Sequence, residues 1–278
     1  MKNTIIYLAI ACILPFIMFS CSKDNNSPAS PLDGLTKLDE GYAIGASAKV
    51  EIWGTRNYFA GYNNLTVVLY DSLNMNQKIT DAHIHFMPTM TMDMGTSTMT
   101  HSAPVENPGV TAVDDVFPGA IIFQMPTVTG GTWSLSVEVH NHKYDKEGEA
   151  DFDISVDNPS EACVTTFTST GSDATNLILA LLNPEKFKVG INDIEFTIFR
   201  KDDMMNFPYD DTYAIEITPE MPSMGHGSPN NENPVNIGDG HYKGQVNFTM
   251  TGMWRIHVVV KKNDVTISPD TYFDVTLK

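Results

Sequence analysis

The chain of 278 residues contains one succession of sequence features twice. Residues 61–70 (GYNNLTVVLY) correspond to residues 190–199 (GINDIEFTIF), and residues 131–139 (GTWSLSVEV) correspond to residues 252–260 (GMWRIHVVV). Between these segments, MPTM at 87–90 matches MPSM at 221–224, and FQM at 123–125 matches FTM at 248–250. A repeat of about 115 residues is far longer than the roughly 20–50 of solenoid repeats, so it predicts two duplicated domains.

Apolar and polar residues alternate in several short segments, which is typical of β-strands with one buried face. Trp133, Leu135 and Val137 share one face, so residues 133–139 are expected to form an antiparallel strand with the Trp as core anchor. Residues 176–182 (NLILALL) fit either a strand or a helical turn. With turn signals between the segments and no convincing long helix, the chain is predicted to be all-β, with two tandem immunoglobulin-like β-sandwiches at 36–158 and 159–278.

The N-terminus has the pattern of a targeting segment. Lys2 precedes a short apolar run at 5–19, which is too short for a membrane span and typical of a signal peptide. The following Ser20-Cys21 resembles a bacterial lipobox. We therefore expect a signal peptide at 1–20, lipidation of Cys21, and a flexible tether at 21–35. This places the protein in the cell envelope, anchored by lipid on the periplasmic or outer-membrane surface.

Charge and cysteine content exclude several kinds of site. The net charge of −17 argues against nucleic-acid binding, because phosphate contacts need Lys and Arg. After loss of Cys12 and lipidation of Cys21, Cys163 is the one remaining thiol and is expected to be a buried apolar residue. The sequence has no nucleophile elbow, zinc-protease motif or phosphate-binding Gly loop, so we do not expect an enzyme.

Methionine and histidine are concentrated in residues 81–108 and again in 218–234. Thr, Asp, Gly and Ser separate the methionines, and Pro88, Gly95 and Pro104 interrupt the first stretch, so both stretches are expected to be exposed loops. Thioether sulfur combined with imidazole suits Cu(I). The candidate ligands are one set in each module: Met87, Met90, His101 and Met125 in the first, and Met221, Met224, His226 and Met250 in the second.

Two further histidine pairs lie on a predicted strand or directly after one. If Ala82, Ile84 and Phe86 face the core, His83 and His85 both face outward and can approach one ion, which would enlarge the first site or let it accept Cu(II). The spacing of His140 and His142 also fits metal binding, but this pair follows a strand and is expected to be a solvated strand end.

The motifs resemble those of the YtkA-like (FixH-like) domain. The second module carries MPSMGHG at 221–227, DGHYKG at 239–244 and GMW at 252–254. The first carries MPTM, FPG at 117–119 and GTW at 131–133, with an insertion of about eight residues. The resemblance implies an extracytoplasmic immunoglobulin-like sandwich linked to copper handling or cytochrome oxidase assembly.

Two functions follow as hypotheses. The first is a copper-binding lipoprotein, acting as a chaperone, buffer or delivery protein, whose partner would be a copper-accepting protein such as an oxidase assembly factor. The alternative is a surface adhesion or recognition module in which the sandwiches are a scaffold and the Met-rich loops an apolar contact surface.

Overall fold

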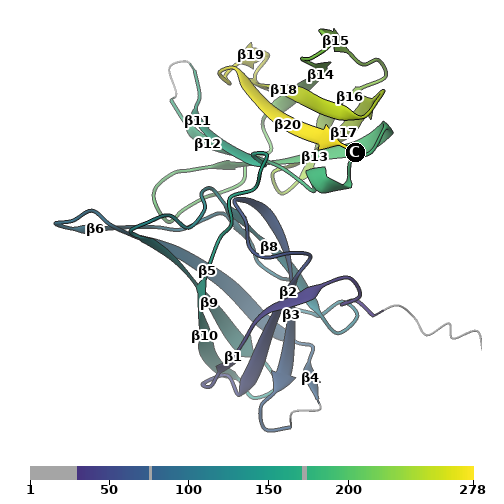
Figure 1. Cartoon of the computed structure of the whole chain (residues 1–278). Helices are drawn as coiled ribbons and strands as arrows, with labels where there is room; N and C mark the ends of the chain where they lie inside the picture. The colour runs from purple at the N-terminus through teal and green to yellow at the C-terminus, as the bar shows by residue number, and fades with distance from the viewer. Residues whose placement is uncertain (1–29, 75–76, 171–173) are drawn as a thin grey trace, which may run out of the picture. The chain divides into compact units, whose positions relative to one another are not determined.

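The computed structural model describes residues 30–74, 77–170 and 174–278, and Pro31–Lys278 forms one compact unit. The expected signal peptide, Cys21 and most of the expected tether lie outside the described residues. The described chain folds into antiparallel sheets that make two β-sandwiches (Figure 1). This confirms the all-β prediction, and the immunoglobulin-like assignment stays a prediction. No helix in the described part is both long and apolar enough to cross a membrane.

The first sandwich contains two sheets. One sheet has the order β1-β2-β3-β8-β7, with β4 also paired to β3. The other has the order β10-β9-β5-β6. The bounds are β1 Thr36–Ala43, β2 Ala48–Gly54, β3 Gly61–Asp71, β4 Lys78–Ile79, β5 Ala82–Asp93, β6 Thr98–His101, β7 Val105–Glu106, β8 Phe117–Phe123, β9 Gly131–Asn141 and β10 Lys146–Ile154.

The second sandwich also contains two sheets. Their orders are β11-β12-β13-β17-β16 and β15-β14-β18-β19, with β20 also paired to β18. The bounds are β11 Val164–Thr168, β12 Asn176–Leu181, η1 Pro184–Lys186, β13 Gly190–Arg200, β14 Ala214–Met221, β15 His226–Gly227, β16 Glu232–Gly238, β17 His241–Phe248, β18 Gly252–Lys262, β19 Val265–Thr266 and β20 Thr271–Leu277. The ambiguous apolar run at 176–182 is therefore a strand.

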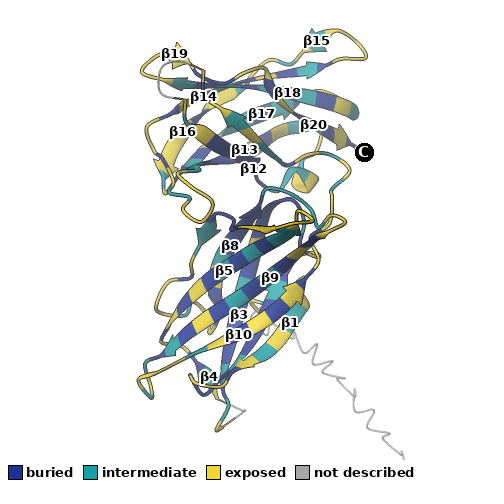
Figure 2. Ribbon diagram, turned by 90° about the vertical axis from the view of Figure 1, so that its left-hand side faces the viewer, coloured by how far each residue is buried: buried dark blue, intermediate teal, exposed yellow. Residues whose placement is uncertain are grey.

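Buried and more exposed residues alternate along the strands, and the inward-facing residues form the core of each sandwich. Trp133, Leu135 and Val137 of β9 are buried, and the residues between them are more exposed (Figure 2). Trp254, Ile256 and Val258 of β18 repeat this arrangement in the second core. Burying these apolar side chains is the main stabilising contribution to each sandwich. Cys163 is a buried free thiol, as expected.

The two sandwiches share local contacts as well as strand order. The Asn63 side-chain amide donates hydrogen bonds to the carbonyls of Phe59 and Gly61, and its oxygen accepts from the Phe59 N–H. Asn192 makes the same three bonds to Lys188 and Gly190. The second pair of matching asparagines is Asn107 and Asn233, whose oxygens accept from the N–H groups of Phe86 and Ile217. The repeat seen in the sequence thus corresponds to two domains with the same strand arrangement and the same local hydrogen bonds.

The first Met-rich stretch is largely strand, which corrects the expectation of an exposed loop. β5 continues through Pro88 to Asp93 and returns as β6, forming the long hairpin that projects in Figure 1. The carbonyl of Pro88 accepts a hydrogen bond from the Ser102 hydroxyl, on the side of β5 that faces away from β9. A strand residue points its N–H and C=O the same way, so the missing N–H of Pro88 costs no bond to β9.

Candidate metal centre

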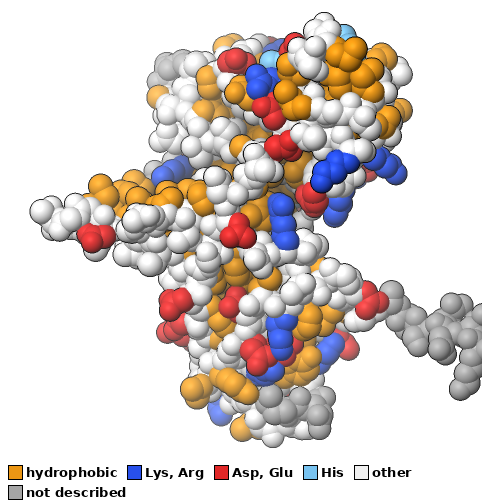
Figure 3. Space-filling view, in the orientation of Figure 1, with side chains coloured by type: hydrophobic (Ala, Val, Ile, Leu, Met, Phe, Trp, Pro, Cys, Tyr) orange, Lys and Arg blue, Asp and Glu red, His pale blue; other side chains and the backbone are white. Residues whose placement is uncertain are grey.

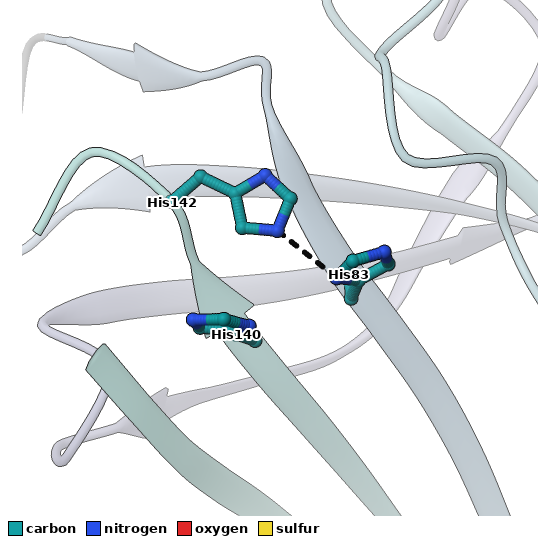
Figure 4. A group of neighbouring side chains, drawn as sticks. All are labelled: His83, His140 and His142. Carbon is teal, nitrogen blue, oxygen red and sulfur yellow. Dashed lines mark hydrogen bonds between the residues drawn. The ribbon is translucent and has the colours of Figure 1, made fainter. Parts of the chain in front are cut away.

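Three histidines of the first sandwich meet where β5 begins and β9 ends. His83 of β5 lies directly opposite His140 of β9, and both are on the outward face of the sheet. Directly opposite residues of antiparallel strands have neighbouring side chains on one face. His142 follows in the turn after β9, and Figure 4 shows its ring turned toward His83. Two strands and one turn therefore bring three imidazoles together.

The three rings are close enough to share one ion. The ring centroids of His83 and His142 are 4.6 Å apart, those of His140 and His142 are 4.9 Å apart, and those of His83 and His140 are 6.0 Å apart. One nitrogen from each ring can be chosen so that all three lie within 4.8 Å of one another. It is the one such group of His, Cys, Asp or Glu found across residues 30–74, 77–170 and 174–278.

Carboxylates orient two of the rings. Asp81 Oδ1 is 2.8 Å from His142 Nδ1, and Asp145 Oδ1 is 3.0 Å from His140 Nε2. An ionised carboxylate can only accept, so the neutral His142 ring carries its hydrogen on Nδ1 and has a lone pair on Nε2. That Nε2 lies 3.0 Å from His83 Nδ1, which donates to it. Carboxylate–histidine contacts of this kind fix ring orientation at metal sites.

The turn that carries His142 is anchored to the sandwich on both sides. Asn141 is buried and donates to the carbonyl of Ala46. Asp71, fully buried at the end of β3, accepts hydrogen bonds from Lys143 Nζ at 2.7 Å and from the Tyr144 hydroxyl at 2.6 Å. These bonds, with that from Lys143 the largest cause, lower the pKa of the Asp71 carboxyl from 3.8 to about 2. The fold thus holds His142 in place through its chain neighbours.

Replacing Asp71 by Asn is expected to lower the free energy of unfolding by about 1.5–3 kcal/mol at pH 7, because charge-assisted hydrogen bonds are lost. The folded-state pKa lies below the unfolded one, so this stabilisation is complete above about pH 4 and disappears as the pH falls toward 2. Urea unfolding would measure the free energy of unfolding of the native chain and of the variant. The difference between the two should be smaller at pH 2.5 than at pH 7. The control is Asp145→Asn, whose carboxylate is 94% exposed. An Asp71→Asn difference that stays constant with pH would contradict this account.

The donor set fits a transition-metal ion. Metal–imidazole bonds of about 2.0–2.1 Å with tetrahedral angles place two ligand nitrogens about 3.3–3.4 Å apart. The facing nitrogens of His83 and His142 are 3.0 Å apart, so a small rotation of the rings makes room for an ion. The ion would replace the proton now shared between those nitrogens, and binding would release it. Three protein ligands would leave at least one coordination position open.

An open groove of about 740 Å³ on the outer face of β5, β9 and β10 is lined by two of these three histidines, His83 and His140. Its lining includes His83, His85, Glu138, His140, Glu147 and Glu149. His85 faces outward as expected and lies opposite Glu138. The prediction paired His83 with His85, whereas the structure groups His83 with His140 and His142. The expectation that the latter two form a plain solvated strand end is replaced by this cluster.

The second sandwich has no equivalent cluster in its described residues. Ala214 and Lys261 form the cross-strand pair that corresponds to His83 and His140. Lys261 is paired with the Glu216 carboxylate at 2.6 Å. Among the described residues, the three-histidine site is therefore a feature of the first sandwich and is not shared by the second.

The sulfur and imidazole groups predicted for the first sandwich are spread over two environments. Met90 is fully buried in the core beside Trp133, and His101 is only 6% exposed. Met125 is partly buried against the same core. Met87 lies opposite Ser136, one residue after the inward-facing Phe86, and so belongs to the outward face. This set does not form one open site.

The predicted set of the second sandwich is more accessible. Met221 is 3% exposed and packs in the core, whereas Met224 is 61% exposed and Met250 is 37% exposed. His226 is partly exposed and lies opposite Met221 in the β14–β15 pair. Three of the four predicted ligands thus reach the surface at one end of this sandwich.

The strand registers correct the alignment of MPTM with MPSM. Met90 pairs with His101, and Met221 pairs with His226. Pro88 lies opposite Leu135, and Pro219 lies opposite Ile256, at the corresponding place beside the Trp254 strand. Met90 therefore corresponds to Met221. The sequence similarity of MPTM and MPSM matches Met87 with Met221 instead, which is three residues away from the structural correspondence.

No curated protein sequence matches the chain. The solved structure of InvD from Yersinia pseudotuberculosis is 17% identical, with a TM-score of 0.26 over 80% of this chain and 55% of that one, so the chain spans about half its length. Domains 5-6 of the S-layer protein SbsC are 12% identical, with a TM-score of 0.30 over 87% of this chain and 97% of that one. Both TM-scores are low, so neither protein's role is carried over.

The family comparison agrees with the motifs of the second module. The matched segment runs from just before β12 through most of β18 and includes the β14–β15 hairpin and Trp254. Residues 171–259 match the model of the YtkA-like family, so the second sandwich contains a YtkA-like domain.

Proposed function

We propose that the chain is an extracytoplasmic metal-binding protein that holds a copper ion at His83, His140 and His142. The observation that carries this proposal is the convergence of three imidazoles, two of them oriented by carboxylates. Imidazole is a common ligand of copper and zinc, and the affinity of such sites for divalent ions rises to a maximum at Cu(II). An all-nitrogen set favours Cu(II) over the Cu(I) expected from the sulfur-rich stretch.

The site has the properties of a carrier or store. The groove beside the histidines is open, and His83 is exposed, so water and a partner's ligand can both reach the ion. An enzyme site would more commonly exclude water around the reacting atoms. An ion with an unfilled coordination position can be passed on by ligand exchange. We therefore assign the chain a role in copper buffering or delivery, with a copper-accepting protein as partner.

The location of the protein is part of the proposal. Lipidation of Cys21 would fix the sandwiches at the envelope membrane. We also assign the first sandwich as a second YtkA-like copy, because it shares the asparagine contacts and the Met–His register of the second.

Titration of the chain with Cu(II), followed by electron paramagnetic resonance, tests the proposal. The expected result is one tightly bound ion whose spectrum shows coupling to imidazole nitrogens. A parallel titration with Zn(II) should give the same stoichiometry with weaker binding, in line with the affinity order. If Cu(II) binds only weakly, or gives a spectrum without nitrogen coupling, the proposed function is wrong.

A further inference from the structure

A group of five residues, one His, one Trp, two Met and one Gly, is repeated at the same end of each sandwich. In the second sandwich, the His226 ring stands across the Trp254 ring at 5.8 Å, and Trp254 Nε1 donates to the carbonyl of Met250 at 3.0 Å. Met221 pairs with His226 across the hairpin, and its methyl group lies 3.3 Å from the place where Gly252 would carry a Cβ. The corresponding group in the first sandwich is His101, Trp133, Met125, Met90 and Gly131.

The imidazole in this group presents a free lone pair. His226 Nδ1 lies 2.9 Å from the carbonyl oxygen of Gly227. A carbonyl can only accept, so Nδ1 carries the hydrogen and, in the neutral ring, Nε2 is the unprotonated nitrogen. Nε2 has no hydrogen-bond partner among the described residues. A backbone carbonyl that fixes the tautomer in this way is the usual support of a metal-binding histidine.

Two exposed methionines have backbones placed near this group. Met224 belongs to the turn between β14 and β15, and its N–H donates to the carbonyl of Met221 at 3.0 Å. The backbone carbonyl of Met250 accepts a hydrogen bond from the indole of Trp254, whose ring also contacts the His226 ring. Figure 3 shows hydrophobic side chains gathered over the β14–β15 end of this sandwich. Met224 is 61% exposed and Met250 is 37% exposed, so core packing does not explain why these two residues are methionine.

The two copies differ in access. In the first sandwich His101 is 6% exposed and Met90 is fully buried, so these two members of the group serve mainly packing. In the second sandwich His226, Met224 and Met250 all reach solvent. The imidazole and the sulfur-bearing side chains of this group are therefore more accessible in the second copy than in the first.

The geometry points to a second, softer metal site in the second sandwich, independent of the three-histidine site. It would take a monovalent soft ion, Cu(I) or Ag(I), on His226 Nε2 and the sulfurs of Met224 and Met250, with Met221 packed beneath. Two thioethers and one imidazole are neutral soft or borderline donors, which suit Cu(I) rather than a hard divalent ion. The chain then offers separate sites for two copper oxidation states.

Titration with Ag(I) tests this site, with calorimetry and tryptophan fluorescence as readouts, because Trp254 lies within 6 Å of the His226 ring. The titration uses the His140→Ala background, so the three-histidine site does not contribute. Met224→Leu combined with Met250→Leu removes both sulfurs and keeps apolar volume. This double variant is expected to lower Ag(I) affinity about 10-fold or more. It should leave Cu(II) binding unchanged when His140 is present.

The matched control is Met253→Leu, at a methionine that is 39% exposed and lies next to Trp254 on the opposite face of β18. Its Ag(I) affinity should equal that of the parent. Leu replaces Met well in packing, so a purely structural role for Met224 and Met250 predicts no loss of Ag(I) binding. Three results would overturn the site. The parent and the double variant could bind Ag(I) equally, the double variant and the control could lose Ag(I) affinity equally, or the parent could fail to bind Ag(I). None of these results would alter the Cu(II) result at the histidine cluster.

Discussion

Replacing His140 by Ala is expected to weaken Cu(II) binding by about 100-fold or more, because changes to groups that merely orient a ligand already cost about 10–100-fold. His140 is the cross-strand partner of His83 and supplies one of the three converging nitrogens. Its loss leaves two nitrogens, His83 Nδ1 and His142 Nε2, that are free to return to their mutual hydrogen bond. Competition with a chelator of known affinity would measure the change.

The matched control for this variant is His85→Ala. His85 is on the same strand, on the same face and in the same groove, but it lies outside the group of converging nitrogens. Its loss should change Cu(II) affinity by less than about threefold, well below the effect of losing even an orienting group. Both substitutions are on the outward face of the sheet, so circular dichroism should show the native fold in each. Similar losses in the two variants would mean that Cu(II) is held by the groove as a whole.

Strand formation was predictable because it depends on local alternation. The sequence Ala82-His83-Ile84-His85-Phe86 has one apolar face, and burial of that face determines that both histidines point outward. Trp133, Leu135 and Val137 give the same kind of signal in β9. Each of these inferences needs only the residues of one strand and the presence of a core.

The three-histidine site depended on information that no single strand contains. His83 and His140 are 57 positions apart, and they meet because of the register between β5 and β9. Pairs of histidines two residues apart occur at His83 and at His140, on segments that both alternate. Testing those two segments as strand neighbours would have suggested the cluster. The contribution of His142 further depends on a turn anchored by the buried Asp71.

The sulfur-rich segments show a different difficulty, because their residue types suggest metal ligands but do not reveal which methionines are buried and which are exposed. Pro88 suggested a loop, yet it is accommodated in β5 because its carbonyl faces away from β9. The similarity of MPTM and MPSM favoured a sequence alignment of the two modules that is shifted by three residues from the alignment of their strands. Burial then separates Met90 and Met221, which are core residues, from Met224, which is at the surface. Side-chain chemistry alone does not distinguish a packed thioether from a ligand.

Replacing Trp254 by Ala is expected to destabilise the second sandwich by about 3–5 kcal/mol, through loss of buried area and creation of a cavity. Trp254 is fully buried, packs against Phe248 at 5.5 Å between centroids, and donates to the carbonyl of Met250. Urea unfolding followed by circular dichroism would measure the shift.

The control for Trp254→Ala is Trp53→Ala, at a tryptophan on β2 that is only partly buried and donates to the Glu51 carboxylate. Its loss should cost about 1.5 kcal/mol or less, as for a side-chain hydrogen bond. Trp254→Phe should lie between the two, because it keeps a ring in the core and loses the indole N–H. That intermediate variant also frees the Met250 backbone, so it should weaken Ag(I) binding while leaving Cu(II) binding intact. Equal destabilisation by Trp254→Ala and Trp53→Ala would mean that Trp254 does not organise the core on which the soft-metal site is built.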